Sequence, residues 1–264
     1  MVLKFVAFLL FIYLVLIVTL FLGQRKLLYF PAHNLPTEQF LQSEDLQYWK
    51  TQDDYYGFIS IKPQKKARGT IIVFHGNAGT AHNRNYYSRA LTPRGYRVLL
   101  AEYPGYGDRK GKPGETAFVA DARKIVREIH EAYGEPIYLW GESLGSGVVA
   151  ATVADSSLPV SGIVLITPWD SLANLARSIY WYFPVRWLLL DKYNSVKNLQ
   201  SYKGNVAILI AQKDEVIPPK FALNLYESVA SNKKLWTFDN AGHNNFPIHH
   251  DAYWWQEVLN FISK

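Results

Sequence analysis

The sequence lacks cysteine altogether and has a single methionine among its 264 residues. The missing thiols exclude a disulfide framework, a thiolate metal site and a cysteine nucleophile. Seven histidines are present, but none belongs to an HExxH motif or to another metal-ligand spacing, and we expect the pair His249-His250 to face solvent. The sequence therefore predicts neither a metal nor a cofactor.

Acidic residues are scarcer than basic ones, with 22 Asp and Glu against 28 Lys and Arg, for a net charge of +6. The basic side chains gather mildly in KPQKKAR (62–68) and DRKGKPG (108–114), two turn-like stretches in which solvated loops are expected. No nucleic-acid-binding motif accompanies them, so we expect no nucleic-acid partner. If these charges attract an anion, lipid head groups are the better candidate.

Charge is entirely missing from one long segment, residues 5–22. Eighteen residues of helix, at ~1.5 Å of rise per residue, span roughly the hydrocarbon core of a bilayer. A cleavable signal peptide would have a shorter apolar core of ~7–15 residues and a small-residue cleavage site, which TLFLGQRK (19–26) does not offer. A soluble helix this apolar would need a core around its whole circumference. We therefore predict that residues 1–26 form a single-pass membrane anchor.

Basic groups flank this segment on both sides. The α-amine and Lys4 precede it, and Arg25 and Lys26 follow it. The two sides carry similar numbers of positive charges, so the positive-inside rule does not decide the membrane orientation.

Strand-like runs recur through the rest of the chain with helix-length spacers between them. Their apolarity is continuous rather than alternating, which is typical of strands covered on both faces. The runs cover residues 70–74, 97–101, 136–140, 161–166, 206–210 and 234–238, with two earlier candidates at 27–31 and 58–61.

Two segments have apolar residues at helical spacing. One stripe consists of Phe118, Ala122, Ile125, Ile129 and Ala132 within residues 116–134, and the other of Trp255, Val258, Leu259 and Ile262 within residues 251–264. Gly134 ends the first helix. The alternation predicts one α/β domain, residues 27–264, with an open, mostly parallel sheet and helices on both faces. Ligands of such sheets bind at the carboxyl ends of the strands.

The stretch GESLG (141–145) fits the G-x-S-x-G motif and lies between a strand-like run and a helix-like run of small residues. This context is that of a nucleophile elbow, in which the serine occupies a strained turn between strand and helix. Gly141 and Gly145 provide the missing side chains that so sharp a turn requires. The pentapeptide alone is also compatible with a plain glycine-rich turn, but its flanks favour Ser143 as a nucleophile.

A serine nucleophile needs a base to take its proton and an acid to orient the base. In this architecture the chain order is serine, acid, histidine. His243 in AGHNN and Asp214 in KDEVIP each follow a strand-like run, so both are expected on the same rim as Ser143. Asp170 in TPWDS is the rival acid. We prefer Asp214 because its strand immediately precedes the one that leads to His243.

An oxyanion hole is expected beside the serine. One donor should be the N–H of Leu144, directly after the nucleophile, and another should come from FHGNAG (74–79), most plausibly from Asn77 or else Gly76. A donor of this kind stabilises a transition state by ~3–4 kcal/mol. His75 in the same loop is expected to have a structural role.

In order along the chain, FHGNAG, EYPGYG, GESLGSG, KDEVIP and AGHNN resemble the α/β-hydrolase superfamily. More narrowly, the chain from about Leu27 onward is similar to the membrane-anchored α/β-hydrolase-domain proteins related to the bud-emergence homologue of yeast, which have many bacterial members. The resemblance implies a hydrolase fold with Ser143, Asp214 and His243 as its triad. It also implies a catalytic domain on the non-cytoplasmic side of the membrane. Pro104 departs from the arginine of many relatives, at the wall of the site rather than in the triad.

Residues 171–203 are long for a simple crossover and contain IYWYFPVRWLLL (179–190). They form either a helix packed on the sheet or a small lid over Ser143, with an apolar surface suited to acyl chains or to the bilayer. Tyr106 and Trp169, on rim loops, are expected to line the same pocket and contact the substrate.

These features together predict a membrane-anchored serine hydrolase. Its substrate would be a small-molecule or lipid-like carboxylic ester or thioester, cleaved through an acyl-enzyme. Hydrolysis of short peptides is a close variant. A catalytically silent hydrolase-fold protein that serves as a membrane scaffold is the alternative from another class.

Overall fold

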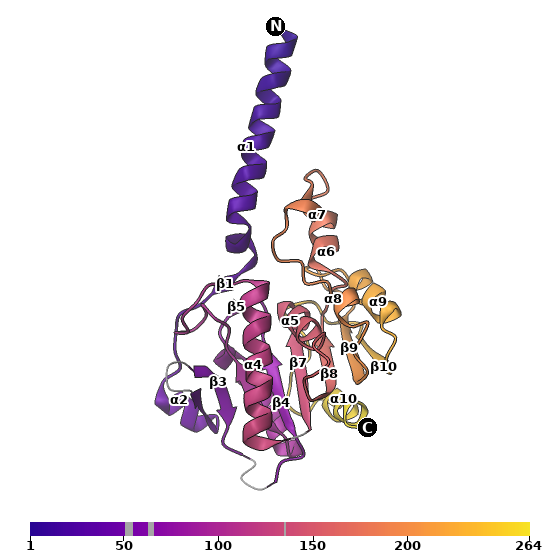
Figure 1. Cartoon of the computed structure of the whole chain (residues 1–264). Coiled ribbons are helices and arrows are strands. Elements are labelled where there is room, and N and C mark those ends of the chain that lie inside the picture. The colour runs from indigo at the N-terminus through magenta and orange to yellow at the C-terminus, as the bar shows by residue number, and fades with distance from the viewer. Residues whose placement is uncertain (51–54, 63–65, 135) are drawn as a thin grey trace.

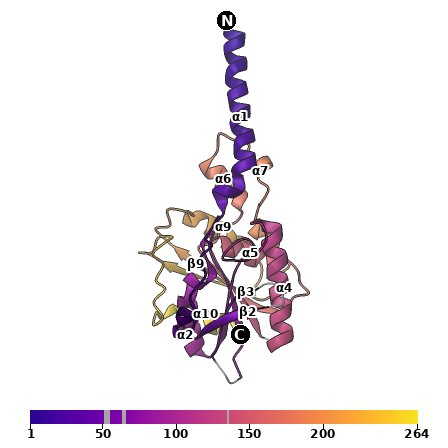
Figure 2. The same ribbon diagram turned by 90° about the vertical axis from the view of Figure 1, so that its left-hand side faces the viewer.

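The computed structural model describes residues 1–50, 55–62, 66–134 and 136–264. Part of the basic segment 62–68 therefore lies outside the described residues. Helix α1 (Val2–Leu28) projects from one end of an α/β domain, and α6 (Leu172–Ile179) and α7 (Val185–Leu188) lie beside the half of α1 that is nearer the domain (Figure 1). The view turned by 90° shows the same arrangement (Figure 2).

The domain is built on an eight-stranded sheet with the strand order β10-β9-β8-β7-β4-β6-β3-β2. Strand β3 (Tyr55–Ser60) pairs antiparallel with β2 (Leu46–Lys50) and with β6, whereas the remaining pairs are parallel. The other strands are β4 (Thr70–Phe74), β6 (Arg97–Ala101), β7 (Ile137–Glu142), β8 (Val160–Ile166), β9 (Asn205–Ala211) and β10 (Lys233–Phe238). The prediction of a mostly parallel α/β sheet is confirmed.

Continuous apolarity of the central strands reflects burial on both faces. In β4, Ile72 and Phe74 enter one hydrophobic core while Ile71 and Val73 enter the other. Successive side chains of a strand point to opposite faces, so a strand with helices above and below has no solvated position left for a polar residue.

Helices cover both faces of the sheet. One core takes residues from α4 (Glu115–Tyr133), α5 (Leu144–Thr152) and α9 (Pro219–Ser228), and the other from α3 (Asn85–Leu91) and α10 (Trp254–Ile262). The shorter elements are α2 (Glu38–Ser43), η1 (Ala81–Arg84), η2 (Thr92–Arg94) and α8 (Ser195–Asn198). The buried stripe of α4 is the predicted one except that Val126 is buried and Ala132 is exposed. Gly134, at φ 78°, caps the helix.

Two predicted elements differ from those observed, and one observed strand was not predicted. The strand expected at 27–31 is mostly helix, because α1 continues to Leu28 and only β1 (Phe30–Pro31) is extended, pairing with β5 (Ala78–Gly79). Nothing in the apolar run stops a helix before Pro31, which forces the residue ahead of it into an extended conformation. Strand β2 was not expected, and the last helix is shorter than residues 251–264.

The two segments outside the main sheet are strongly apolar. Helix α1 has no buried residue and is long and apolar enough to cross a membrane. In α6, Leu172 and Leu175 are buried, but the chain that follows exposes Tyr180, Trp181 and Trp187. Most of the large side chains in the α6–α7 segment (residues 172–190) thus remain exposed instead of being buried against the sheet.

A cluster of tryptophans attaches the last helix to the strand that leads into residues 141–145. Trp140 of β7 is fully buried and stacks on Trp255 of α10 with ring centroids 5.6 Å apart. Trp254 stacks on Trp255 at 3.8 Å and lies 6.4 Å from Trp140. This packing supports β7 from the face opposite α5.

Replacing Trp140 with alanine should lower the free energy of unfolding by about 3–5 kcal/mol, the usual cost of emptying a large buried aromatic site. Trp187→Ala is the matched control, because that side chain is 85% exposed and its loss should change stability by less than about 0.5 kcal/mol. Denaturant unfolding of both variants in the same detergent measures the difference. Equal stabilities for the two variants would contradict the assigned packing.

Candidate active site

The turn after β7 holds Ser143 in a backbone conformation that residues with side chains rarely adopt. Its φ is 52° and its ψ is −114°, and α5 begins at the next residue. A Cβ on Gly145 would overlap the carbonyl of Phe74, and one on Gly141 would overlap the carbonyl of Gly145. Both glycines are therefore required by close backbone approach, and the turn has the geometry of a nucleophile elbow.

Three side chains from three loops meet at this turn. His243 Nε2 lies 3.1 Å from Ser143 Oγ, and His243 Nδ1 lies 2.8 Å from Asp214 Oδ2. The other oxygen of Asp214 accepts hydrogen bonds from the N–H groups of Val216 and Ile217, at 2.9 and 2.7 Å. A carboxylate only accepts hydrogen bonds, so Nδ1 carries the proton and Nε2 is free to accept one from the serine hydroxyl.

Asp170, the rival acid, lies in a separate set of contacts. Its carboxylate accepts hydrogen bonds from the N–H of Ser171 and from the side-chain amides of Asn174 and Asn224. These bonds tie the loop after β8 to α6 and α9. The structure brings Asp214, and not Asp170, to the imidazole.

The predicted oxyanion loop is held by the end of α1. The Asn77 side chain donates to the Leu28 carbonyl at 2.9 Å, and the Asn77 carbonyl accepts from Phe30 N–H and from Tyr106 Oη. These bonds fix the side-chain amide toward Leu28 and the carbonyl toward Phe30 and Tyr106, and the backbone N–H of Asn77 is a further donor that it can offer to a substrate. Leu144 is the first residue of α5, and its N–H lacks an intrahelical acceptor.

Gly76 lies behind the serine rather than in the pocket. A Cβ at this position would come within 3.7 Å of the Ser143 Cβ and 3.4 Å of Glu142 Oε1. Its carbonyl accepts a hydrogen bond from the His75 ring at 2.7 Å. Of the two candidates in this loop, Asn77 lines the pocket and Gly76 does not.

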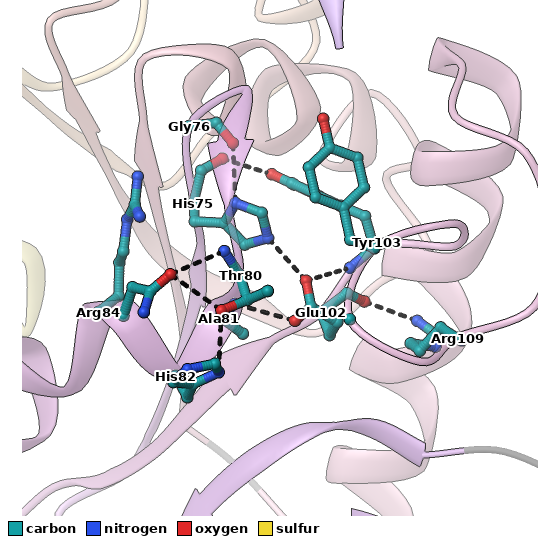
Figure 3. A network of polar contacts seen from close by, with 12 residues as sticks. His75, Gly76, Thr80, Ala81, His82, Arg84, Glu102, Tyr103 and Arg109 are labelled. Carbon is teal, nitrogen blue, oxygen red and sulfur yellow. Dashed lines mark hydrogen bonds and ion pairs between the residues drawn. The ribbon is translucent and has the colours of Figure 1, made fainter. Parts of the chain in front are cut away.

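A buried polar network fixes the base of the same loop (Figure 3). Glu102, which follows β6, accepts hydrogen bonds from the His75 ring at 3.0 Å and from the N–H of Ala81 at 3.0 Å. Tyr103 Oη donates to the His75 carbonyl at 2.8 Å, and Arg109 donates to the Glu102 carbonyl at 2.6 Å. Glu102 was not among the predicted functional residues, although an acidic residue directly after a buried strand was a usable signal.

Glu142, the residue before the serine, is paired rather than catalytic. It accepts hydrogen bonds from Arg84 at 3.0 Å, Tyr86 at 2.6 Å and Tyr87 at 3.3 Å. Burial opposes ionisation of this carboxyl, but the charge of Arg84 and the hydrogen bonds from Tyr86 and Arg84 outweigh it and hold its pKa below the usual value. These contacts tie the elbow to η1 and α3.

A cavity of about 490 Å³ opens above the serine, within the range of ligand pockets (~300–1,000 Å³). Ser143, Leu144, Asn77 and His243 lie at its floor. The walls come from the α6–α7 segment, from the last turns of α1 and from Val216 and Ile217. Most of these side chains are apolar, which suits a hydrocarbon chain.

Of the two expected substrate contacts, one lines this cavity and the other does not. Trp169 is among the lining residues, with its indole N–H bonded to the Tyr193 carbonyl. Tyr106 is instead fully buried in the core below the oxyanion loop, where its ring packs 5.9 Å from Phe118 and its hydroxyl reaches the Asn77 carbonyl. The prediction placed it by its loop alone, which does not indicate the direction of the side chain.

One group of residues that could hold a metal ion lies away from this cavity. Within the described residues, His249, His250 and Asp251 are close enough together to share an ion, but all three are exposed in the loop before α10. None of them lines the pocket.

Replacing Glu142 with glutamine should lower the free energy of unfolding at pH 7 by about 1.5–3 kcal/mol, because Arg84 loses a charged acceptor. A carboxyl whose pKa is lowered by folding stabilises the protein above its unfolded pKa, near 4.5, and this contribution is lost as the pH falls through the folded value. The variant should therefore lose less stability than the unmodified protein between pH 6 and pH 3. Glu131→Gln, at an exposed position of α4, is the matched control and should follow the unmodified protein.

Comparison with known proteins agrees with this geometry. A family model described as Hydrolase_4, serine aminopeptidase S33, matches residues 65–190. The lysophosphatidylserine lipase ABHD12 of Danio rerio is 31% identical over 193 residues, which cover 66% of this chain. The chain spans half the length of that lipase.

Two further comparisons cover more of the molecule. The uncharacterized protein Rv2307c of Mycobacterium tuberculosis is 31% identical over 229 residues, covering 84% of this chain and 81% of that protein. The structure of Est1E from Butyrivibrio proteoclasticus, solved with ferulic acid, matches with a TM-score of 0.69 at 17% identity, over 83% of this chain and 100% of Est1E. The chain therefore belongs to the α/β-hydrolase superfamily, with ABHD12 and Rv2307c among its relatives.

Proposed function

We propose that the chain is a membrane-anchored hydrolase that cleaves acyl esters or thioesters through an acyl-enzyme on Ser143. The observation that carries this proposal is the chain of contacts from Asp214 through His243 to Ser143, at 2.8 and 3.1 Å, on the floor of an apolar pocket. These distances are those that a base and a nucleophile need for proton transfer.

In the proposed acylation step, Ser143 Oγ attacks the carbonyl carbon while His243 Nε2 takes the hydroxyl proton. Asp214 holds the imidazole in the tautomer that accepts this proton and stabilises the imidazolium that forms. The negative charge moves to the substrate oxygen, where the N–H groups of Leu144 and Asn77 act as donors. Collapse of this intermediate breaks the bond to the alcohol or thiol, which leaves with the proton from His243.

Deacylation repeats the sequence with water as the nucleophile. His243 takes a proton from the water, the hydroxide attacks the acyl carbonyl, and Ser143 leaves with the proton returned by the imidazole. The products are a fatty or other carboxylic acid and the free serine.

The pocket favours an acyl substrate over a peptide. An aminopeptidase needs an acidic group for the substrate's ammonium, and the one carboxylate among the described lining residues, Asp191, already accepts two hydrogen bonds from Arg25. The name of the ABHD12 relative, a lysophosphatidylserine lipase, supports a lipid ester, while the name of the family model keeps peptides as an alternative. A silent scaffold would have no use for the aligned triad.

Helix α1 is proposed as the membrane anchor, crossing with residues 5–22. None of its residues is buried and most of them are exposed, so an aqueous environment would leave a very large apolar surface uncovered. The catalytic domain is proposed on the non-cytoplasmic side, as in the membrane-anchored hydrolases that the sequence resembles. The α6–α7 segment is proposed as the lid of the pocket.

Substitutions test whether Asp214 or Asp170 is the acid of the triad. A fluorophosphonate probe should label the unmodified protein and should not label Ser143→Ala. Asp214→Asn should lower kcat for p-nitrophenyl butyrate by about 10⁴, the scale seen when a triad acid is neutralised. Asp170→Asn is the matched control and should stay within about tenfold of the unmodified enzyme, because that carboxylate does not touch the imidazole.

A larger loss of kcat in Asp170→Asn than in Asp214→Asn would make Asp170 the acid of the triad. Persistent labelling of Ser143→Ala would remove the serine from its role. Acyl-thioester and short-peptide substrates assayed beside the p-nitrophenyl ester decide between the substrate classes, and turnover of the peptide alone would overturn the acyl-ester proposal.

The oxyanion donor from Asn77 is proposed to be its backbone N–H. Asn77→Ala keeps this group and removes only the side-chain bond to Leu28, so kcat should fall by less than about tenfold. A side-chain donor would instead cost about 10²–10³ in kcat when removed. Steady-state kinetics on the purified variants, normalised by active-site titration, distinguish the two cases.

A further inference from the structure

Helix α1 reaches the pocket with its last turns. Leu20, Phe21, Gln24, Leu27 and Leu28 are all among the residues that line the cavity above Ser143. They face the α6–α7 segment, whose lining residues include Ala176, Ile179 and Phe183. One wall of the cavity is thus made by the membrane helix itself, although nothing in its sequence apart from apolarity indicates such a role.

Polar contacts fix this wall in place. The Gln24 side chain donates to the Leu188 carbonyl at 3.1 Å and accepts from the Leu190 N–H at 2.9 Å, so both ends of its amide are used by the same stretch of the α6–α7 segment. Arg25, the next residue of the helix, forms a two-bond ion pair with Asp191, at 2.9 and 3.0 Å. The spacing between α1 and the segment is therefore set by directional bonds and not only by apolar packing.

The same segment reaches far along α1. Tyr13 donates to the Tyr182 carbonyl at 2.8 Å and stacks on Phe183 with ring centroids 5.7 Å apart. Tyr13 lies near the middle of the uncharged run 5–22, about 16 Å of helix above Gln24 at ~1.5 Å per residue. The tip of the α6–α7 segment thus lies beside the middle of α1, and both ribbon views show the segment along the half of α1 that is nearer the domain (Figure 1, Figure 2).

The outer surface of this tip is apolar and uncovered. Trp181 and Tyr182, next to the contact with Tyr13, are each at least half exposed, and so is Trp187 further along the segment. A hydrocarbon environment that surrounds α1 at the level of Tyr13 also surrounds these side chains, which explains why they face outward. The occupant that fits the surface is the acyl-chain region of the leaflet adjacent to the catalytic domain.

We propose that the last two turns of α1 form a wall of the acyl-binding pocket, so that the acyl chain of a lipid ester lies between α1 and the α6–α7 segment, with its carbonyl at Ser143 and its tail directed toward the bilayer. This inference rests on the proposed function and assigns the side chain of Leu20 as a determinant of chain length. The substrate then enters from the leaflet and does not have to leave it completely.

Replacing Leu20 with tryptophan tests this wall, with Leu22→Trp as the matched control on the same helix. Leu20 lines the pocket, whereas Leu22 is 76% exposed and does not. The readout is kcat/KM of the full-length chain in detergent micelles for p-nitrophenyl esters from C4 to C16. In Leu20→Trp the ratio of the long-chain to the short-chain value should fall at least about tenfold, the scale of one methylene in an apolar pocket. In Leu22→Trp it should be unchanged.

A covalent probe gives an independent readout on the unmodified chain. Long-chain alkyl fluorophosphonates with a diazirine at the end of the chain would react at Ser143 and, on irradiation, cross-link to whatever surrounds the tail. The adduct is expected on α1, between Leu20 and Leu28, or in the α6–α7 segment. Adducts confined to other parts of the chain would overturn the proposal.

The two levels of the proposal fail in different ways. If a small fluorophosphonate labels neither the unmodified chain nor Leu22→Trp, the serine hydrolase assignment fails. If it labels both, but Leu20→Trp and Leu22→Trp have the same chain-length profile, the hydrolase stands and the wall formed by α1 is rejected.

Discussion

The close crossing of α5 over β7 and β4 is the constraint on which the site depends. The backbone of Gly145 passes so near the Phe74 carbonyl that no side chain fits between them, and Gly141 meets Gly145 in the same way. This approach forces Ser143 into its positive φ and directs its hydroxyl above the sheet edge. Because parallel strands end at one edge, the loops after β9 and β10 deliver Asp214 and His243 to that hydroxyl without further distortion.

The charges around the elbow hold backbone in place and do not take part in the proposed chemistry. Glu142 ties the elbow to Arg84, and Glu102 ties His75 of the oxyanion loop to the end of β6. A buried charge without a partner is strongly unfavourable, so such pairs define a single arrangement of the loops that carry them. The strained turn is maintained by these contacts and by the tryptophan packing on the far side of β7.

Much of this arrangement could be predicted from the sequence. Continuous apolar runs indicated the central strands because two cores leave no polar position in them, and the G-x-S-x-G stretch with its flanks indicated the elbow. Asp214 was preferred from strand order, which follows from topology. The same reasoning missed β2, and it placed Tyr106 in the pocket although the side chain points into the core, because a loop position does not specify a side-chain direction.

The hydropathy pattern of the sequence could not predict the long-range side-chain contacts. Nothing in the sequence of residues 1–26 indicates that Tyr13 contacts Tyr182, or that Gln24 bonds with Leu188. Such contacts join positions more than 160 residues apart, and they depend on how the α6–α7 segment folds back over the sheet edge. Hydropathy identifies a helix that can cross a membrane but cannot show which of its faces meets the domain.

The junction around Asp191 bears on how the protein is prepared. This side chain is 3% exposed, Arg25 of α1 supplies its cation, and the N–H of Glu115 at the start of α4 donates to the same carboxylate at 3.0 Å. A soluble fragment beginning after residue 28 would bury that acid without its arginine and would deprive Asn77 of the Leu28 carbonyl. Truncation for crystallisation or screening thus alters the chemistry of the cavity as well as solubility, whereas detergent extraction of the intact chain preserves it.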